Sequence, residues 1–294
     1  MATAAEWIEG ARPRTLGAAV APIAVGTGVA AAADSLQWPR ALLALVVMLA
    51  AQVGVNYAND YSDGIRGTDR QRVGPVRLVG QGLAPAGRVR LAAIASLGIC
   101  AVAGLLLVAL TGEWWLLIVG ALAIAAAWLY TGGPRPYGYL GLGEVFVFIF
   151  FGVVPVVGTA YVQIMAFTMT AWVSSLGVGT LICAVLVANN LRDIPTDTEA
   201  GKRTLAVRLG DRRTRVLYVA LVASAFVVVP FLAVPHGLGL RFAWLGLLAV
   251  PLAVRPVAAV SRGAVGRDLV AVLQGTGLLV LAYGLLLGLG IGLS

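Results

Sequence analysis

Apolar runs of about bilayer length follow one another along nearly the whole of this 294-residue chain. A transmembrane helix needs about 20 predominantly apolar residues, and 60% of the residues here are hydrophobic whereas only 12% are charged. A soluble domain carries about twice that charged fraction. The runs are continuously apolar rather than alternating, which argues against a transmembrane β-barrel. The sequence therefore predicts an all-α, polytopic membrane protein.

We expect nine transmembrane helices in one bundle. The predicted spans lie near residues 16–33, 40–58, 91–110, 114–131, 143–162, 171–190, 215–234, 240–260 and 269–291. If the N-terminus is cytoplasmic, all of the 21 Lys and Arg residues except Arg40 and Arg241 fall on the cytoplasmic side, which is the positive-inside pattern. This predicts a bacterial cytoplasmic membrane protein with its C-terminus outside. The net charge of +8 then reflects topology, and we expect no nucleic-acid partner.

Two polar segments interrupt this background, each where a predicted helix reaches the cytoplasm. Residues 56–69 read NYANDYSDGIRGTD, and residues 189–203 read NNLRDIPTDTEAGKR. Together they hold six of the 13 acidic residues. Carboxylates gathered at a membrane boundary call for a cation. We expect both segments to face one central cavity that opens to the cytoplasmic side and takes a magnesium-bound diphosphate.

The two segments also indicate a weak internal repeat. Asn56 and Asp60 are spaced i, i+4, as are Asn189 and Asp193, so each pair shares one helix face. Each pair is expected to end a helix and to open a long, irregular basic loop. The predicted organisation is a single domain over residues 1–294, with helices 1–4 at about 16–131, helices 5–8 at about 143–260 and a ninth helix at about 269–291.

The residue types in these segments suit metal-assisted diphosphate chemistry. Asp60 and Asp63 in the first segment, and Asp193 and Asp197 in the second, are hard oxygen ligands for Mg²⁺, which shares substrate phosphate oxygens. Basic side chains beside them can neutralise the remaining phosphate charge. These are Arg66, Arg72, Arg77, Lys202 and Arg203. The alternative is a salt-bridged cytoplasmic rim without a ligand, although a rim does not need asparagines at matched positions.

A third segment, residues 130–144, reads YTGGPRPYGYLGLGE and joins the fourth and fifth predicted helices. Its tyrosines either line the cavity, where aromatic faces stabilise an allylic carbocation, or belong to an interfacial aromatic belt. Glu144 is interpreted as a partner of the dipole at a helix N-terminus rather than a cavity acid. Arg14, one step deeper than the anchoring Arg12, could reach an anionic acceptor.

These three segments resemble the UbiA family of intramembrane aromatic prenyltransferases, and the resemblance spans essentially the whole chain. It implies a reaction in which a polyprenyl diphosphate ionises with the help of Mg²⁺. The allylic carbon then attacks 1,4-dihydroxy-2-naphthoate at the ring position that carries the carboxylate. Carbon dioxide and diphosphate leave, giving demethylmenaquinone. The partners implied are these two substrates and membrane lipid.

The resemblance also implies roles by position. Asp60, Asp63, Asp193 and Asp197 would bind metal, and Asn56 and Asn189 would orient metal or phosphate. Arg66, Lys202 and Arg203 would hold diphosphate, while Tyr139, also a candidate catalytic residue, would serve the acceptor side with Arg14. Asn59, Arg72 and Tyr130 are further candidate substrate-binding residues. One departure from the family pattern is Gly67, which stands where a third aspartate is expected, with Asp69 two residues later. The role of Asp69 therefore stays open.

Three alternatives remain at the level of sequence. The acceptor could be another aromatic compound, such as 4-hydroxybenzoate or a tetrapyrrole. A CDP-alcohol phosphotransferase also uses intramembrane aspartates and Mg²⁺, and Asp63-Gly64 fits the start of its motif, but the following Ala-Arg step is missing. A cation-coupled transporter would carry its acids near the bilayer midplane, whereas these lie at helix ends. Neither prenyl chain length nor oligomeric state is predicted.

Overall fold

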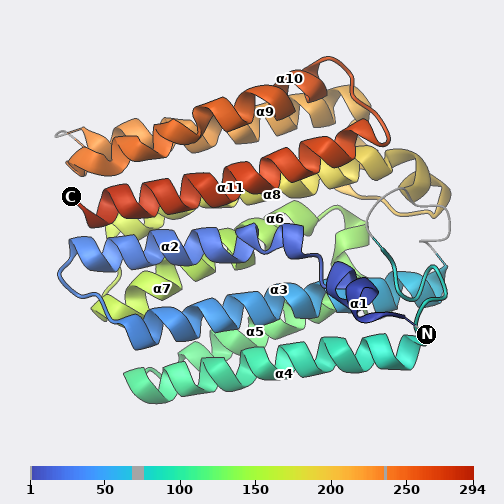
Figure 1. Ribbon diagram of the computed structural model, residues 1–294, viewed down its shortest axis with the longest axis horizontal. Helices are drawn as coiled ribbons and strands as arrows, with labels where there is room; N and C mark the ends of the chain where they lie inside the picture. Colours follow the sequence, from blue (N-terminus) through green and yellow to red (C-terminus); the bar gives the residue numbers. More distant parts are fainter. Residues whose placement is uncertain (1, 68–75, 235–236) are drawn as a thin grey trace.

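The computed structural model describes residues 2–67, 76–234 and 237–294, and within these ranges the chain forms helices and no strand. Long helices run side by side along one common direction (Figure 1). In chain order the elements are α1 (Ala4–Gly10), η1 (Pro13–Thr15), α2 (Gly17–Ala32), α3 (Trp38–Arg66), α4 (Ala86–Thr111), α5 (Leu116–Leu129), η2 (Tyr137–Leu140), α6 (Gly143–Val147), η3 (Phe148–Val153), α7 (Val154–Ile164), α8 (Met169–Glu199), α9 (Leu205–Ala233), η4 (Arg241–Ala249), α10 (Val250–Ser261) and α11 (Asp268–Gly292). Helices are expected because backbone groups in hydrocarbon must pair within their own segment.

The chain is a multi-pass membrane protein by the length and composition of its helices. Seven helical stretches among the described residues are long and apolar enough to cross a bilayer. These are α3, α4, α6 to α7, α8, α9, η4 to α10, and α11. An eighth, α2, qualifies only together with α1 and η1, from which it is bent by 46°. Because α5 has 14 residues, less than a bilayer needs, the count of nine spans stays a prediction.

The helices α3 and α8 continue further than the sequence predicted. We expected loops from residues 59 and 191, but α3 ends at Arg66 and α8 at Glu199. Four aspartates of the two extensions, Asp60, Asp63, Asp193 and Asp197, are buried, so they pack inside the protein instead of reaching water, whereas Arg66 and Glu199 at the helix ends are exposed. Gly67, with a φ of 72°, then ends α3 in the left-handed conformation common at helix C-termini. The acidic side chains consequently stand on rigid helical faces.

Small residues let the first and last long helices approach closely. The helices α2 and α11 lie side by side in Figure 1. A Cβ atom added to Gly28 of α2 would lie 2.0 Å from the carbonyl oxygen of Gly288 in α11. Such glycine contacts are the usual means of tight helix packing in membranes. The other two extensive pairings join α3 to α4 and α8 to α9, the helices that flank the two acidic segments.

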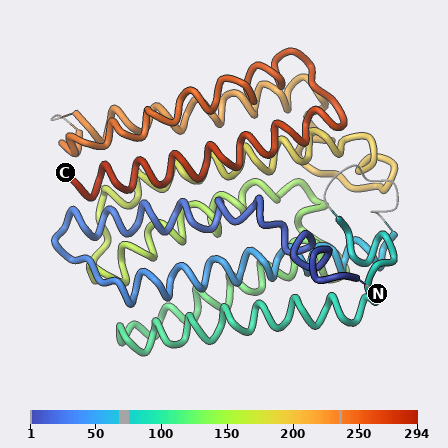
Figure 2. The backbone as a smooth tube through the Cα atoms, viewed as in Figure 1, coloured from blue at the N-terminus to red at the C-terminus, as the bar shows by residue number. Residues whose placement is uncertain are grey.

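One end of the bundle gathers the polar parts of the chain. The helices α3 and α8 end there and α4 and α9 begin there. We call it the polar end. The N-terminus and α1 also lie at the polar end, whereas the C-terminus lies at the opposite end (Figure 2).

Candidate functional site

A cavity of about 1160 Å³ runs into the bundle from the polar end, between α3, α5, α7 and α8. Most of the residues that the sequence predicted for the site contribute to its wall. These are Arg14, Asn56, Asn59, Asp63, Tyr130, Tyr139, Asn189, Asp193, Asp197 and Lys202. The structure therefore brings the two acidic segments and the tyrosine segment to one cavity.

The two acidic helices meet at a lysine. Nζ of Lys202, in the connection between α8 and α9, lies 3.3 Å from Oδ1 of Asp63 on α3 and 3.7 Å from Oδ1 of Asp197 on α8. All three side chains are buried. Because an ammonium group lies between these two carboxylates, this part of the site is able to accommodate positive charge.

Tyr139 belongs to this ionic cluster. Its hydroxyl donates a hydrogen bond to Oδ1 of Asp63. Nζ of Lys202 lies 4.6 Å from the centroid of the tyrosine ring, a cation–π arrangement. The short helix η2 thus places Tyr139 beside the acids rather than against the aromatic wall of the cavity.

Asp193 is held by its own helix. Arg192 donates to it from Nε at 2.7 Å and from Nη2 at 2.9 Å, and the same Nη2 reaches Oδ1 of Asn189 at 2.9 Å. Asn189 in turn donates to Oδ2 of Asp193 at 3.3 Å. Nη1 of Arg192 is buried and finds no hydrogen-bond partner among the described residues. Arg192, which the sequence analysis did not single out, therefore keeps a buried donor at the cavity wall.

Three predicted site residues point elsewhere. Asp60, 1% exposed, accepts hydrogen bonds from the backbone N–H groups of Leu78 at 2.7 Å and Val79 at 3.1 Å. Arg66 donates to backbone carbonyl groups of the segment after α5. Arg203 is exposed, and its backbone N–H donates to the carbonyl oxygen of Tyr139 at 2.9 Å. These three residues fasten connecting segments around the cavity.

The turn that Asp60 anchors also places a basic side chain, Arg77, beside Asp63. Nη2 of Arg77 lies 4.0 Å from Oδ2 of Asp63 and its side chain is buried. Two further predictions, Arg72 and Asp69, lie outside the described residues. Glu144 stands in the first turn of α6, as predicted, and accepts a hydrogen bond from Asn190 Nδ2 at 2.9 Å.

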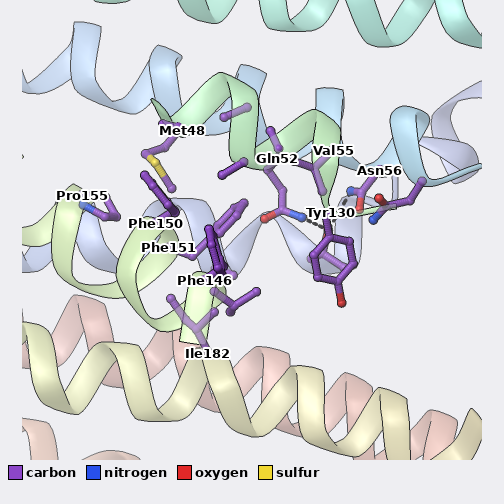
Figure 3. A pocket seen from close by; sticks show the side chains of 18 of the residues that line it. Met48, Gln52, Val55, Asn56, Tyr130, Phe146, Phe150, Phe151, Pro155 and Ile182 are labelled. Carbon is purple, nitrogen blue, oxygen red and sulfur yellow. Dashed lines mark hydrogen bonds between the residues drawn. The ribbon is translucent and has the colours of Figure 1, made fainter. Parts of the chain in front are cut away.

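Asn56 and Asn59 connect α3 to neighbouring segments. Nδ2 of Asn56 donates to the carbonyl oxygen of Ala11 at 2.9 Å and to Thr15 Oγ1 at 3.1 Å, while Asn59 Oδ1 accepts from Thr131 Oγ1 at 2.8 Å. Gln52, one turn before Asn56, joins the same network (Figure 3). Nothing in the sequence distinguished Gln52 except that it is a polar residue within an apolar run.

Aromatic rings from three consecutive elements, η2, α6 and η3, form one wall of the cavity. The rings of Tyr137 and Phe146 are stacked with centroids 4.1 Å apart, and Phe146 is also stacked with Phe150 at 6.1 Å. Phe150 and Phe151 belong to η3, a π-helical turn that brings both to the wall together with Phe146 (Figure 3). Such turns are frequent at functional sites. Burial raises the pKa of Tyr137, whose hydroxyl stays protonated and donates to the carbonyl oxygen of Ala126 at 2.7 Å.

Away from the polar end the cavity is apolar. Its walls there come from α3, α4, α5 and α7 and include Met48, Leu107 and Leu116. Leu105 of α4 and Leu117 of α5 line the cavity and are 49% and 42% exposed. The apolar arm therefore extends between α4 and α5, where these side chains leave it unfilled.

The ionic cluster fits a hard divalent cation that shares its ligands with a substrate. Among the described residues, no three His, Cys, Asp or Glu side chains lie close enough to hold a metal ion unaided. The carboxylates of Asp63, Asp193 and Asp197 nevertheless line one cavity, and Lys202 already neutralises two of them. Mg²⁺ typically takes one or two carboxylates and completes its shell with water and phosphate oxygens.

These features define an integral membrane protein with an ionic site at one end of a helical bundle and an apolar arm leading from it. The chain belongs to the UbiA prenyltransferase family, which it matches over residues 19–268. It is 54% identical to the 1,4-dihydroxy-2-naphthoate octaprenyltransferase of Mycobacterium tuberculosis over 97% of this chain and 96% of that protein. It is 38% identical to the enzyme of the same name from Escherichia coli, over 87% of this chain and 85% of that protein.

Solved structures share the fold. A UbiA homolog from Archaeoglobus fulgidus bound to GPP and Mg²⁺ superposes with a TM-score of 0.67 at 16% identity, covering 95% of this chain and 98% of that one. The apo structure of a UbiA homolog from Aeropyrum pernix gives 0.68 at 17% identity, over 91% and 96%. Membership of the family favours prenyl transfer over the CDP-alcohol and transporter alternatives left open by the sequence.

Proposed function

We propose that this chain transfers a polyprenyl group from polyprenyl diphosphate to 1,4-dihydroxy-2-naphthoate. The allylic C–O bond of the donor breaks, and its electron pair leaves with diphosphate. A C–C bond forms at the ring carbon that carries the carboxylate, and carbon dioxide departs from that carbon. The product is the quinol form of demethylmenaquinone. The observation that carries the proposal is the convergence of Asp63, Asp197 and Lys202 at the mouth of a cavity whose far arm is apolar.

The donor's diphosphate would lie at the polar end. Asp63, Asp193 and Asp197 would hold Mg²⁺, which supplies charge neutralisation for the leaving diphosphate. Lys202 and Arg192 would donate hydrogen bonds to phosphate oxygens. The side chain of Lys202 is flexible enough to turn its ammonium group toward phosphate, and Nη1 of Arg192 is a buried donor without a partner among the described residues. Asp60 accepts hydrogen bonds from Leu78 and Val79 and is not among the residues that line the cavity, so its metal role stays a prediction.

The donor's polyprenyl tail would lie in the apolar arm. A tail of several isoprene units is long and apolar, so it does not suit the charged opening of the cavity and needs an apolar surface continuous with lipid. Leu105 of α4 and Leu117 of α5 line the arm and are only partly buried, and an exit to lipid between these two helices would give the tail such a surface. This supports a membrane-embedded donor and a site at the membrane boundary.

The acceptor ring would lie against the aromatic wall. Phe146 and Phe150 offer flat faces near Tyr130, and offset stacking stabilises an aromatic ligand. Arg14 lines the same cavity and could neutralise the acceptor carboxylate before it is lost. Tyr139 is bonded to Asp63 and would act with the donor site rather than with the acceptor.

We further propose that nine helices cross the bacterial cytoplasmic membrane with the polar end in the cytoplasm. The distribution of Lys and Arg supports this orientation, and so does the placement of the two termini at opposite ends of the bundle.

Mass spectrometry of reaction products tests the function. Purified protein is incubated with Mg²⁺, a polyprenyl diphosphate and an equal mixture of 1,4-dihydroxy-2-naphthoate and 4-hydroxybenzoate. A prenylated naphthoquinol that has lost its carboxyl group is expected. Prenylated hydroxybenzoate in its place would reassign the acceptor, and release of diphosphate without any prenylated ring would contradict prenyl transfer.

A further inference from the structure

Gln52 is a buried polar side chain on the cavity wall that has no part in the proposed metal and diphosphate sites. It is 8% exposed, lies one turn before Asn56 on α3, and stands between the ionic mouth and the apolar arm. Burial of a carboxamide is costly unless both its N–H groups and its oxygen find partners. The hydrogen bonds around it reveal which end faces the cavity.

The network around Gln52 has a fixed direction because it ends on backbone carbonyl groups. The hydroxyl of Thr15 donates a hydrogen bond to the carbonyl oxygen of Arg12 at 2.9 Å. Nδ2 of Asn56 donates to the carbonyl oxygen of Ala11, also at 2.9 Å. Thr15 Oγ1 and Asn56 Oδ1 are therefore both acceptors toward Gln52. Both accept a hydrogen bond from Nε2 of Gln52, Thr15 Oγ1 at 3.3 Å and Asn56 Oδ1 at 3.5 Å. A flipped carboxamide would set its oxygen against Asn56 Oδ1, so the nitrogen must face the network.

The oxygen of Gln52 is consequently turned to the cavity. In Figure 3 the Gln52 carboxamide has its nitrogen toward the Asn56 side and its oxygen toward the side of Phe146, Phe150 and Phe151. Within the described part of the chain, no donor reaches Oε1. The cavity thus presents one buried hydrogen-bond acceptor beside an aromatic wall.

The chemistry of the two substrates decides which of them this acceptor fits. A polyprenyl diphosphate consists of hydrocarbon and phosphate oxygens and brings no O–H group to this part of the cavity. A carboxylate on the aromatic acceptor would be repelled by a carbonyl oxygen. A ring hydroxyl is the complementary group, because it can donate to Oε1 while its ring stacks on phenylalanine.

We propose that Gln52 Oε1 accepts a hydrogen bond from a ring hydroxyl of the aromatic acceptor and so fixes how the ring lies against the wall formed by Phe146, Phe150 and Phe151. This inference rests on the proposed function. Gln52 then selects hydroxylated aromatic acceptors, and its hydrogen bonds to Thr15 and Asn56 hold the carboxamide in this orientation.

A double-mutant cycle between enzyme and ligand tests the inference. Wild type and Gln52→Met, which has similar size but no carboxamide, are titrated by calorimetry with 1,4-dihydroxy-2-naphthoate and with each of its two monohydroxy analogues. The analogue that lacks the hydroxyl bound by Gln52 should bind wild type about tenfold more weakly than the naphthoate does, as expected for the loss of one hydrogen bond. Loss of the same hydroxyl should weaken Gln52→Met binding by less than about twofold, while KM for the donor is unchanged.

Two controls separate binding from folding. Gln163→Met removes another buried glutamine, at the opposite end of the bundle, whose partners are Gln37 and Thr159; it should discriminate between ligands as wild type does. If Gln52→Met does not fold, Gln52→Asn keeps the carboxamide but withdraws its oxygen from the cavity, and the same loss of discrimination is expected.

The inference is overturned if Gln52→Met still distinguishes the monohydroxy analogues as wild type does. It is also overturned if the variant raises KM for donor and acceptor in parallel without any change in hydroxyl preference, which would make Gln52 a packing residue. A wild-type protein that binds the naphthoate but forms no prenylated product contradicts the proposed function instead, so the two failures are distinguishable.

Discussion

Lys202 places its Nζ 3.3 Å from Oδ1 of Asp63, a residue 139 positions earlier in the chain. This ion pair crosses from the connection after α8 to the last turns of α3. It joins two segments that the sequence marks separately as acidic. Both side chains are more than nine-tenths buried, so their interaction is weakly screened by solvent.

The first prediction concerns Lys202. Lys202→Met should raise KM for polyprenyl diphosphate by about 10- to 100-fold, because a charge-assisted hydrogen bond to phosphate contributes about 1.5–3 kcal/mol. Lys202→Arg keeps the charge and should lose less. Steady-state kinetics with varied donor and saturating acceptor measures the effect. An unchanged donor KM in Lys202→Met would place the diphosphate elsewhere.

The second prediction separates Asp60 from Asp63. Asp60→Asn should lower both turnover and melting temperature, because a carboxamide can accept from only one of the N–H groups of Leu78 and Val79 and leaves the other unsatisfied, at a cost of about 1–3 kcal/mol. Asp63→Asn should abolish turnover and also lower the melting temperature, because it leaves buried Lys202 and Arg77 with less compensating charge. Thermal unfolding in detergent, read beside activity, measures both. An Asp60→Asn variant with the wild-type melting temperature would argue against the anchoring role of Asp60.

The third prediction concerns the metal. Chelation with EDTA should abolish release of diphosphate, and added Mg²⁺ should restore it, since three carboxylates line the site. Asp193→Asn and Asp197→Asn should each require more Mg²⁺ for half-maximal rate. The rate is measured against free Mg²⁺ concentration. Full activity in excess EDTA contradicts the metal site.

The fourth prediction concerns the π-helical turn. A Cβ atom on Gly152 would lie 2.5 Å from Cα of Gly179 in α8, so Gly152→Ala must push two helices apart. We expect a loss of about 1–3 kcal/mol in stability, typical of overpacking, and lower activity because Phe150 and Phe151 move. Gly98→Ala in α4 is the matched control, since a Cβ atom there meets no atom within 4 Å. A Gly152→Ala variant as stable as Gly98→Ala would contradict the close contact.

The sequence predicted the helices well because bilayer length and apolar content are strong signals. It misplaced the ends of α3 and α8, since Asp60, Asp63 and Asp193 have the polarity of loop residues. Asp60 and Asp63 contact connecting segments, whereas Asp193 is held by Asn189 and Arg192 of its own helix, and the contacts with connecting segments have no local signal in the sequence. The internal repeat, based on the matched pairs Asn56/Asp60 and Asn189/Asp193, stays a prediction.

The site was predictable where residues cluster and unpredictable where they act alone. Asp63, Asp197 and Lys202 lie in segments that composition singles out, and they meet in the structure. Gln52 is one polar residue in a long apolar run, and its importance depends on a network with Thr15 that only the fold creates. The π-helical turn at Phe148–Val153 likewise has no sequence motif, and it packs closely against Gly179 of α8.

In the proposed site, acids from α3 and α8 together hold a metal-bound diphosphate at the mouth of the cavity. An experimental structure with Mg²⁺ and a donor analogue whose diphosphate is replaced by an unreactive thiodiphosphate tests this arrangement. We expect density for the diphosphate between Asp63 and Asp197, with Nζ of Lys202 moved from the carboxylates to a phosphate oxygen. Diphosphate bound away from these two residues, with the Lys202 ion pairs intact, would contradict it.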